Sequence, residues 1–258
     1  MNYIGIDIGS TCAKTVVLNE KKEIIQEFVQ PTGWSSVDTA EEIHQKLQLA
    51  GINLSDDSSC CVATGYGRIS VPYADKTVTE ITCHALGAVH LFQQPDLTVI
   101  DIGGQDTKII QIEQGVVKDF IMNDKCAAGT GRFLEVMANT LSLRPNEMFD
   151  LARLGSDTTI SSMCTVFAES EVIGLIGKGE PKENIAYAVV NSTIRKVAAQ
   201  VSRMNDEMST FCLTGGLCEC EYIREALSKG LGKEVISCPD ARYAGAIGAA
   251  LSAMKIRK

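Results

Sequence analysis

The sequence predicts an α/β protein made of two similar halves, and three observations support this prediction. A strand–turn–strand unit at residues 3–18 recurs at residues 97–112. A separate Gly-Gly turn stands at residues 215–216, between an apolar run and a helical stretch. A run of small residues at 244–250 predicts a helix that can pack closely against a neighbouring helix, because interaxial distance depends on side-chain size at the contact.

The two copies of the repeat share both their residue types and their spacing. Each contains Asp-Ile-Gly and has a lysine seven residues after the aspartate: Asp7 and Lys14 in the first copy, Asp101 and Lys108 in the second. An apolar run, a glycine turn and a second β run predict a hairpin. Strand-like stretches follow each copy, at residues 23–29 and 116–122, so each half is expected to begin with a three-stranded meander.

The glycine turns have the composition of phosphate-binding loops. Gly9 in the first copy, and Gly103 and Gly104 in the second, let the backbone turn tightly and approach a ligand. Successive backbone N–H groups in such a turn form a concave anion site. An aspartate at the end of each strand can hold Mg²⁺ through its waters. We therefore predict that the two copies together bind the phosphates of a nucleotide.

The Thr214-Gly215-Gly216 turn adds a place where a nucleoside can approach the backbone near a helix start, at about residue 219. Two glycine-containing hairpins, this turn and the small-residue helix together resemble the nucleotide site of the actin/sugar-kinase/Hsp70 (ASKHA) superfamily. The resemblance extends over nearly the whole chain. It implies two ribonuclease-H-like α/β lobes, at residues 1–95 (joined by the C-terminal helix at about 243–258) and 96–242, with ATP·Mg²⁺ in the cleft. The sequence contains no Gly-x4-Gly-Lys-Ser/Thr P-loop.

Between the two meanders, the spacing of apolar residues predicts helices over residues 39–49 and 78–92, and residues 64–68 are expected to form a loop. His84 follows Cys83 on the second of these helices. We interpret this pair as core packing, not as a metal site.

Composition excludes several classes of function. With 45% hydrophobic and 22% charged residues, the 258-residue chain resembles an ordinary globular protein. No apolar run approaches the roughly 20 residues needed to span a membrane. The net charge of −8 and the scattered basic residues argue against nucleic-acid binding. The N-terminus leads directly into a strand without a basic leader, so we expect a cytoplasmic protein.

Ten cysteines suggest that some bind metal or perform redox chemistry, although most are expected to be buried. Cys126 and Cys164 are expected to stand at or just before helix starts, with helices that run to about residues 141 and 176. A helix N-terminus stabilises a thiolate or a negatively charged iron–sulfur cluster. Two cysteines cannot complete a four-thiolate cluster unless two subunits each contribute a pair. The spacing alone leaves two free cysteines as an open alternative.

The segments around these cysteines are specific. Asn-Asp-Lys-Cys-Ala-Ala-Gly-Thr-Gly-Arg-Phe at 123–133 and Ser-x-x-Cys-Thr-Val-Phe-Ala-Glu-Ser-Glu at 161–171 resemble the signatures of the activator ATPases of 2-hydroxyacyl-CoA dehydratases. That group includes the BadF/BadG/BcrA/BcrD-type subunits of benzoyl-CoA reductase and the reductases of double-cubane-cluster proteins. The resemblance implies a homodimer with one bridging [4Fe–4S] cluster, held by Cys126 and Cys164 of each protomer.

The resemblance also implies a function: ATP hydrolysis drives one-electron transfer from a ferredoxin or flavodoxin to a dehydratase-like or double-cubane-cluster enzyme. The expected catalytic residues are Asp7 and Asp101, which hold Mg²⁺, with Gln105 or Asp106 positioning the attacking water. The expected ATP or ADP contacts in the phosphate turns are Gly9, Ser10, Thr11, Cys12, Ala13, Lys14, Gly103, Gly104 and Gln105. Gly215, Gly216 and Arg242 are expected on the nucleoside side.

Two alternatives share the nucleotide motifs. A small-molecule kinase could use Asp106 as its base, and an ATP-dependent assembly protein would need no catalysis. Bound iron separates both from the electron-transfer hypothesis. The remaining cysteines that we considered are interpreted as structural or incidental: Cys12, Cys60, Cys61, Cys83, Cys218 and Cys220.

Overall fold

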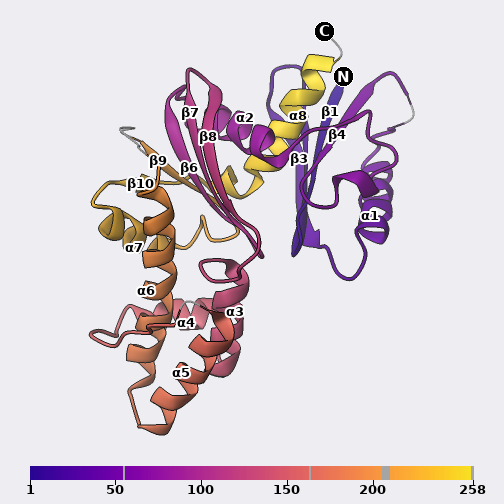
Figure 1. Cartoon of the computed structure of the whole chain (residues 1–258). Helices are drawn as coiled ribbons and strands as arrows, with labels where there is room; N and C mark the ends of the chain where they lie inside the picture. The colour runs from indigo at the N-terminus through magenta and orange to yellow at the C-terminus, as the bar shows by residue number, and fades with distance from the viewer. Residues whose placement is uncertain (55, 163, 205–209, 257–258) are drawn as a thin grey trace. The chain divides into compact units, whose positions relative to one another are not determined.

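The structure is a computed structural model that describes residues 1–54, 56–162, 164–204 and 210–256. Backbone contacts divide the chain into two compact units (Figure 1). The first unit comprises Met1–Val99, Ile110–Lys118 and Cys238–Lys258, and the second comprises Ile100–Ile109 and Asp119–Ser237. Each half of the chain contains a five-stranded sheet.

The first sheet has the strand order β3-β2-β1-β4-β5. Its strands are β1 (Asn2–Ile8), β2 (Cys12–Leu18), β3 (Ile24–Pro31), β4 (Ser59–Thr64) and β5 (Lys76–Thr77). Strands β1, β2 and β3 pair antiparallel in sequence order, as the predicted meander requires, and β4 joins β1 in parallel. The predicted first meander is therefore confirmed.

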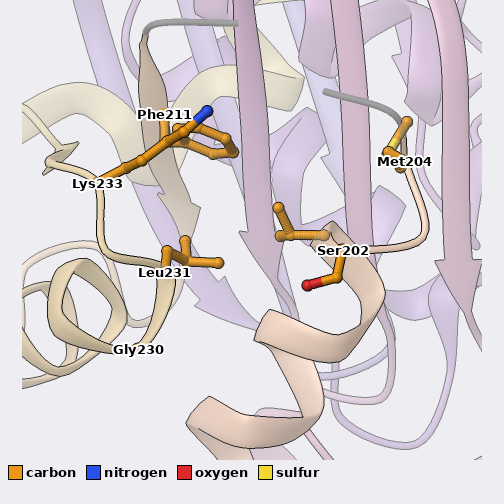
Figure 2. A pocket seen from close by; sticks show the side chains of 7 residues that line it. Ser202, Met204, Phe211, Gly230, Leu231 and Lys233 are labelled. Atoms are coloured by element: carbon orange, nitrogen blue, oxygen red, sulfur yellow. The ribbon is translucent and has the colours of Figure 1, made fainter. Parts of the chain in front are cut away.

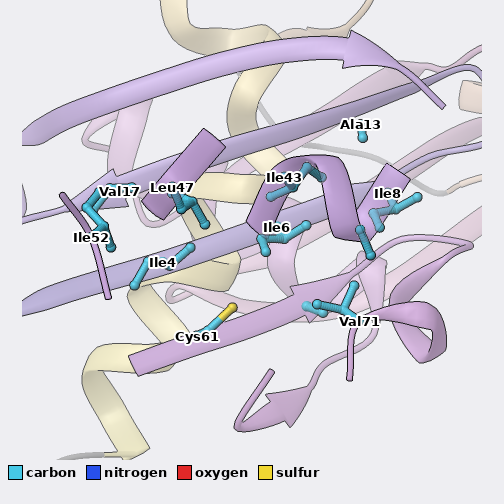
Figure 3. Packing of buried hydrophobic residues seen from close by; sticks show 12 residues of the cluster. Ile4, Ile6, Ile8, Ala13, Val17, Ile43, Leu47, Ile52, Cys61 and Val71 are labelled. Carbon is cyan, nitrogen blue, oxygen red and sulfur yellow. The ribbon is translucent and has the colours of Figure 1, made fainter. Parts of the chain in front are cut away.

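One face of this sheet packs against α1 (Ser36–Leu49). Alternate residues of β1 point to this face, because successive side chains of a strand point to opposite sides. Ile4, Ile6 and Ile8 are fully buried and cluster with Ile43 and Leu47 of the helix (Figure 3). The helix begins three residues before the predicted start, because the Ser35 side chain accepts a hydrogen bond from the Asp38 N–H and caps it.

The opposite face packs against α8 (Ala244–Ile256), which lies beside α2 (Glu80–Phe92). The predicted small-residue helix is confirmed, and its composition has a packing reason. A Cβ atom at Gly248 would lie 1.7 Å from the carbonyl oxygen of Cys83, and one at Gly87 would lie 1.9 Å from that of Ala244. The two helices approach so closely that both positions require glycine.

The second sheet has the order β10-β9-β6-β7-β8. Its strands are β6 (Leu97–Ile102), β7 (Thr107–Glu113), β8 (Val116–Asn123), β9 (Phe211–Gly215) and β10 (Val235–Ile236). Strands β6, β7 and β8 correspond to the second predicted meander and are neighbours in the sheet, in sequence order.

The second unit also carries five helices among its described residues: α3 (Gly131–Thr140), α4 (Pro145–Ala152), α5 (Thr165–Gly177), α6 (Lys182–Val201) and α7 (Glu221–Leu231). The long helix α6 contacts α4 and α7 (Figure 1). Short 3₁₀ turns lie at Arg68–Ser70 and Pro239–Tyr243. None of the described helices has both the length and the apolar character that a membrane crossing requires.

Candidate functional site

The two turns that the sequence predicts to bind phosphate are called the first and second phosphate turns, and the first connects β1 to β2 in the first unit. Asp7 stands one residue before the end of β1 and is only 6% exposed. The Gly9 N–H donates to the Cys12 carbonyl (3.1 Å), which closes the turn. Thr32 fixes the turn from β3's end: its N–H donates to the Thr11 carbonyl (2.9 Å) and its hydroxyl to the Gly9 carbonyl (2.7 Å).

The side chains of this turn differ in exposure. Thr11 is exposed, whereas Ser10, Cys12 and Lys14 are partly buried and Ala13 is buried. Lys14 lies opposite Asp7 in the β1–β2 register. Its ammonium group forms no ion pair with any residue that the structure describes. This charge is therefore available to a ligand.

The corresponding lysine of the second unit has a different environment. Lys108 is 3% exposed, and its Nζ lies 2.7 Å from Asp106 Oδ2 and 3.4 Å from Asp101 Oδ2. The Thr214 hydroxyl donates to the other oxygen of Asp101 (2.8 Å). Lys108 therefore neutralises two carboxylates, one of them deeply buried, and its role differs from that of Lys14.

The second phosphate turn, residues 103–106, is bonded to the start of α3. The Gly103 N–H donates to the Asp106 carbonyl (2.9 Å), which closes the turn. The turn carbonyls accept from the first helical N–H groups: Gly103 from Gly131 (2.9 Å) and Gly104 from Arg132 (2.8 Å). Gln105 is exposed at the turn.

A second duplicated feature escaped the sequence analysis. Thr64 ends β4 and is followed by Gly65, much as Thr214-Gly215 ends β9, and the two glycines have nearly the same positive φ, +83° and +84°. A Cβ at Gly65 would lie 2.4 Å from Asp7 Oδ1, and one at Gly215 would lie 2.9 Å from Asp101 Oδ1. Each glycine thus lets the chain pass over the carboxylate of its own unit. The Thr-Gly pair that ends or follows an apolar run in both halves could have indicated this second repeat from the sequence.

Behind Asp7 lies His84 of α2. It is buried, as predicted, and its Nε2 lies 3.9 Å from Asp7 Oδ2. The core position of this histidine therefore places a polar ring beside the carboxylate expected to hold Mg²⁺.

The residues expected on the nucleoside side lie in different units. Gly215 is buried and Gly216 exposed, in the loop that leads to α7 of the second unit. Arg242 lies in the 3₁₀ turn of the first unit. There its charge acts on Glu27: burial and the Asp240 carboxylate raise the pKa of Glu27, and the Arg242 charge opposes them.

The ten cysteines separate sharply by exposure. Only Cys126 and Cys164 are exposed; Cys60, Cys61, Cys83, Cys212 and Cys218 are buried, and Cys12, Cys220 and Cys238 are intermediate. Burial raises the pKa of the Cys83 thiol to about 12 and raises that of Cys61 as well. Buried protonated thiols are inert, whereas exposed ones can ligate a metal. The two exposed cysteines therefore fit the chemistry of thiolate ligands.

Their positions relative to the helices differ. Cys164 is the N-cap residue of α5, as expected. For Cys126 the expectation was wrong: α3 is capped by Thr130, four residues later. A separate turn intervenes, because both the N–H and the hydroxyl of Thr130 donate to the Ala127 carbonyl.

A polar side chain anchors each cysteine loop. Asn123 Nδ2 donates to the carbonyls of Cys126 (2.8 Å) and Ala128 (3.1 Å). The Glu171 carboxylate accepts the N–H groups of Ser161 (3.0 Å) and Ser162 (3.1 Å).

A cavity of about 190 Å³ lies elsewhere in the second unit (Figure 2). Its lining comes from the end of α6, the start of β9 and the end of α7, and includes Ser202, Phe211 and Lys233. The Lys233 ammonium stands 5.0 Å from the Phe211 ring centre. None of the predicted site residues lines this cavity.

Two relatives match the chain over almost its full length. The (R)-2-hydroxyglutaryl-CoA dehydratase activating ATPase of Acidaminococcus fermentans is 44% identical over 257 residues, covering 98% of this chain and 96% of the relative. The activator of lactoyl-CoA dehydratase of Anaerotignum propionicum is 41% identical over 255 residues, covering 98% and 97%.

Solved structures agree with these matches. The activator of the 2-hydroxyisocaproyl-CoA dehydratase from Clostridium difficile with bound ADPNP superposes with a TM-score of 0.90 at 34% identity, covering 99% of this chain and 95% of that one. A ROK-family glucokinase from Streptomyces griseus gives a TM-score of 0.62 at 17% identity, covering 99% and 100%. That likeness concerns the fold alone, and it confirms the predicted actin-like, two-lobed α/β class.

The model of the BadF/BadG/BcrA/BcrD ATPase family matches residues 4–253. This match confirms the predicted resemblance and the predicted ATPase class, and it does not favour the kinase or assembly alternatives. The chain belongs to the BadF/BadG/BcrA/BcrD ATPase family.

Proposed function

We propose that this chain couples ATP hydrolysis to one-electron transfer, as a homodimer that holds one [4Fe–4S] cluster and reduces a 2-hydroxyacyl-CoA dehydratase-like or double-cubane-cluster enzyme. One observation carries the proposal: Cys126 and Cys164 alone among the ten cysteines are exposed. Each lies on a loop fixed by a polar side chain, Asn123 or Glu171. Two such pairs, one from each subunit, would supply the four thiolates that a [4Fe–4S] cluster requires.

The nucleotide chemistry follows from the two phosphate turns. Asp7 and Asp101 are the carboxylates proposed to hold Mg²⁺ through water, and Lys14, which forms no ion pair within the described parts of the chain, supplies a positive charge for the phosphates. Asp106 is engaged by Lys108 at 2.7 Å, whereas Gln105 is exposed. We therefore assign the positioning of the attacking water to Gln105. We also propose that the two lobes that bind the nucleotide comprise residues 1–95, joined by the C-terminal helix, and residues 96–242.

The nucleotide supplies energy that the electron donor lacks. When bound, the cluster would carry the transferred electron, which a ferredoxin or flavodoxin delivers. For a one-electron step, each 1.4 kcal/mol taken from ATP hydrolysis changes the reduction potential by roughly 59 mV. Dehydratase-type activators among the relatives support the choice of acceptor.

Iron analysis tests this proposal. The protein and its Cys126→Ala, Cys164→Ala and Cys220→Ser variants are purified without oxygen, and iron, acid-labile sulfide and ATP hydrolysis are measured. Cys220 is the matched control, because it stands at a helix N-cap, as Cys164 does, but is half-buried. We expect about four irons per dimer in the wild type and in Cys220→Ser, and none in the other two variants. An iron-free wild-type protein that still hydrolyses ATP would refute electron transfer.

A further inference from the structure

The loop that carries Cys126 is bonded directly to the second phosphate turn. The Thr107 side chain, fully buried at the end of this turn, provides one of the links. One hydrogen bond joins the loop itself to the turn, from Thr107 Oγ1 to the Gly129 carbonyl (2.6 Å). Two more join the start of α3, which directly follows the loop, to the same turn: Gly131 N–H to the Gly103 carbonyl (2.9 Å) and Arg132 N–H to the Gly104 carbonyl (2.8 Å). A displacement of the turn would therefore be transmitted to the loop.

The Cys126 loop is also braced internally. Asn123 ties the carbonyls of Cys126 and Ala128 to the end of β8. The Thr130 N–H and hydroxyl both bind the Ala127 carbonyl, at 3.0 and 2.6 Å. With these bonds in place, residues 123–130 form one connected segment, and Cys126 follows wherever Gly129 moves.

Cys164 is anchored differently. The residues before it are held by Glu171, which lies two turns along α5. Among the described residues, no hydrogen bond joins 158–162 or 164–171 to the turn at 103–106 or to Thr107. Helix α5 does contact α3, through the Thr140 hydroxyl and Glu169 (3.1 Å), but at the end of α3 remote from the turn.

We propose that Thr107 is a positioning residue that couples the nucleotide state to Cys126, while Cys164 stays fixed on α5. The inference rests on the proposed function, since it requires that the nucleotide touch the Gly103–Gly104 turn and that Cys126 serve as a ligand. The two proposed cluster ligands of a protomer therefore differ: Cys126 responds to the nucleotide and Cys164 does not.

Hydrogen exchange followed by mass spectrometry tests this asymmetry in the full-length, anaerobically purified protein, with and without Mg·ADPNP. We expect the nucleotide to slow exchange in peptide 124–132 and to leave peptide 158–162 unchanged. In Thr107→Val the nucleotide should no longer slow exchange in peptide 124–132. The expected loss is about fivefold in exchange rate, because one ordinary buried hydrogen bond changes local opening by about that factor. Thr107→Ser, which keeps the hydroxyl, restores the effect.

The matched control is Thr193→Val, because Thr193 is equally buried but its hydroxyl has no hydrogen-bond partner among the described residues. It should leave both peptides as in the wild type. Glu171→Gln should accelerate exchange in 158–162 with or without nucleotide. Nucleotide affinity, measured by calorimetry, should be the same in the wild type and in all these variants.

Two outcomes would overturn the inference: equal responses of the two peptides in the wild type, or a Thr107→Val response as large as that of the wild type. The wild-type comparison decides even if Thr107→Val fails to fold. Iron measured in the same samples separates this inference from the proposed function. An iron-free protein with the expected exchange pattern contradicts only electron transfer, and an iron-loaded protein without the pattern contradicts only the coupling.

Discussion

Replacing Lys108 by methionine should destabilise the second unit strongly. The Lys108 ammonium lies 3.4 Å from Asp101 and 2.7 Å from Asp106, and the side chains of Lys108 and Asp101 are 4% and 3% exposed. Methionine preserves most of the side-chain length but leaves the buried Asp101 carboxylate without its cation. Breaking a buried ion pair on one side costs about 3–5 kcal/mol. At about 2–4 °C per kcal/mol for a chain of this size, the midpoint of thermal unfolding should fall by about 6–20 °C.

The double variant Asp101→Asn/Lys108→Met supplies the control. Asparagine keeps an oxygen that can accept the Thr214 hydroxyl bond and removes the buried charge. The double variant should therefore recover part of the lost stability, and thermal unfolding of the four proteins gives a coupling energy of about 0.5–3 kcal/mol. A decrease below about 2 °C in Lys108→Met, smaller than the loss of one ordinary hydrogen bond would produce, would refute the reasoning.

Three further predictions concern other groups. Lys14→Met should leave the unfolding midpoint nearly unchanged but weaken ATP binding by about tenfold to a hundredfold, because it removes one charge-assisted hydrogen bond. Calorimetry can measure this affinity, and an unchanged value would exclude the phosphate contact. Burial acts to raise the pKa of Glu171, but the N–H groups of Ser161 and Ser162 outweigh it and hold the pKa below the ordinary 4.5. The Glu171 carboxylate therefore stabilises the Cys164 loop fully above pH 4.5, and this stabilisation is lost as the pH falls through the lowered pKa. In the iron-free protein, the amide resonances of Ser161 and Ser162 should shift with pH below 4.5, and in Glu171→Gln they should not. Iodoacetamide at about pH 8 should label Cys126 and Cys164 of the iron-free protein well before Cys61 and Cys83, because thiolate is the reactive form; peptide mass spectrometry that found equal rates would contradict the burial argument.

The repeat made much of this fold predictable. Both meanders followed from Asp-Ile-Gly, its lysine offset and the flanking apolar runs, and the C-terminal helix, predicted at about 243–258, followed from the small residues at 244–250. The loop predicted at residues 64–68 is confirmed only for 65–67, because Thr64 still pairs within β4 and a 3₁₀ turn begins at Arg68. Helices α4 and α6 were not predicted. The buried side of α6 is covered in part by α4 and α7, so its burial depends on these helices and not on a local pattern alone. Local patterns carry weak information about elements stabilised mainly by tertiary packing.

The sequence predicted which residue types form the candidate site, but it did not predict the ion pairs and hydrogen bonds that surround each of them. The sequence indicated two equivalent lysines, yet only the packed structure distinguishes Lys14, which has no acidic partner among the described residues, from Lys108, which has two. Similarly, Cys126 and Cys164 looked alike as residues near helix starts. Their different anchors, Asn123 and Glu171, arise from hydrogen bonds that spacing does not encode.

The close packing of α8 on β1 and α2 affects how the chain folds during synthesis. Helix α8 (Ala244–Ile256) follows the second unit along the chain, yet it covers one face of a sheet whose central strand begins at Asn2. The second unit, in contrast, is complete once residue 237 has been made. Because domains generally fold as their residues emerge, the second unit can fold first, while that face of the first sheet stays exposed until α8 has been made. A nascent chain truncated before α8 is therefore the form most exposed to aggregation.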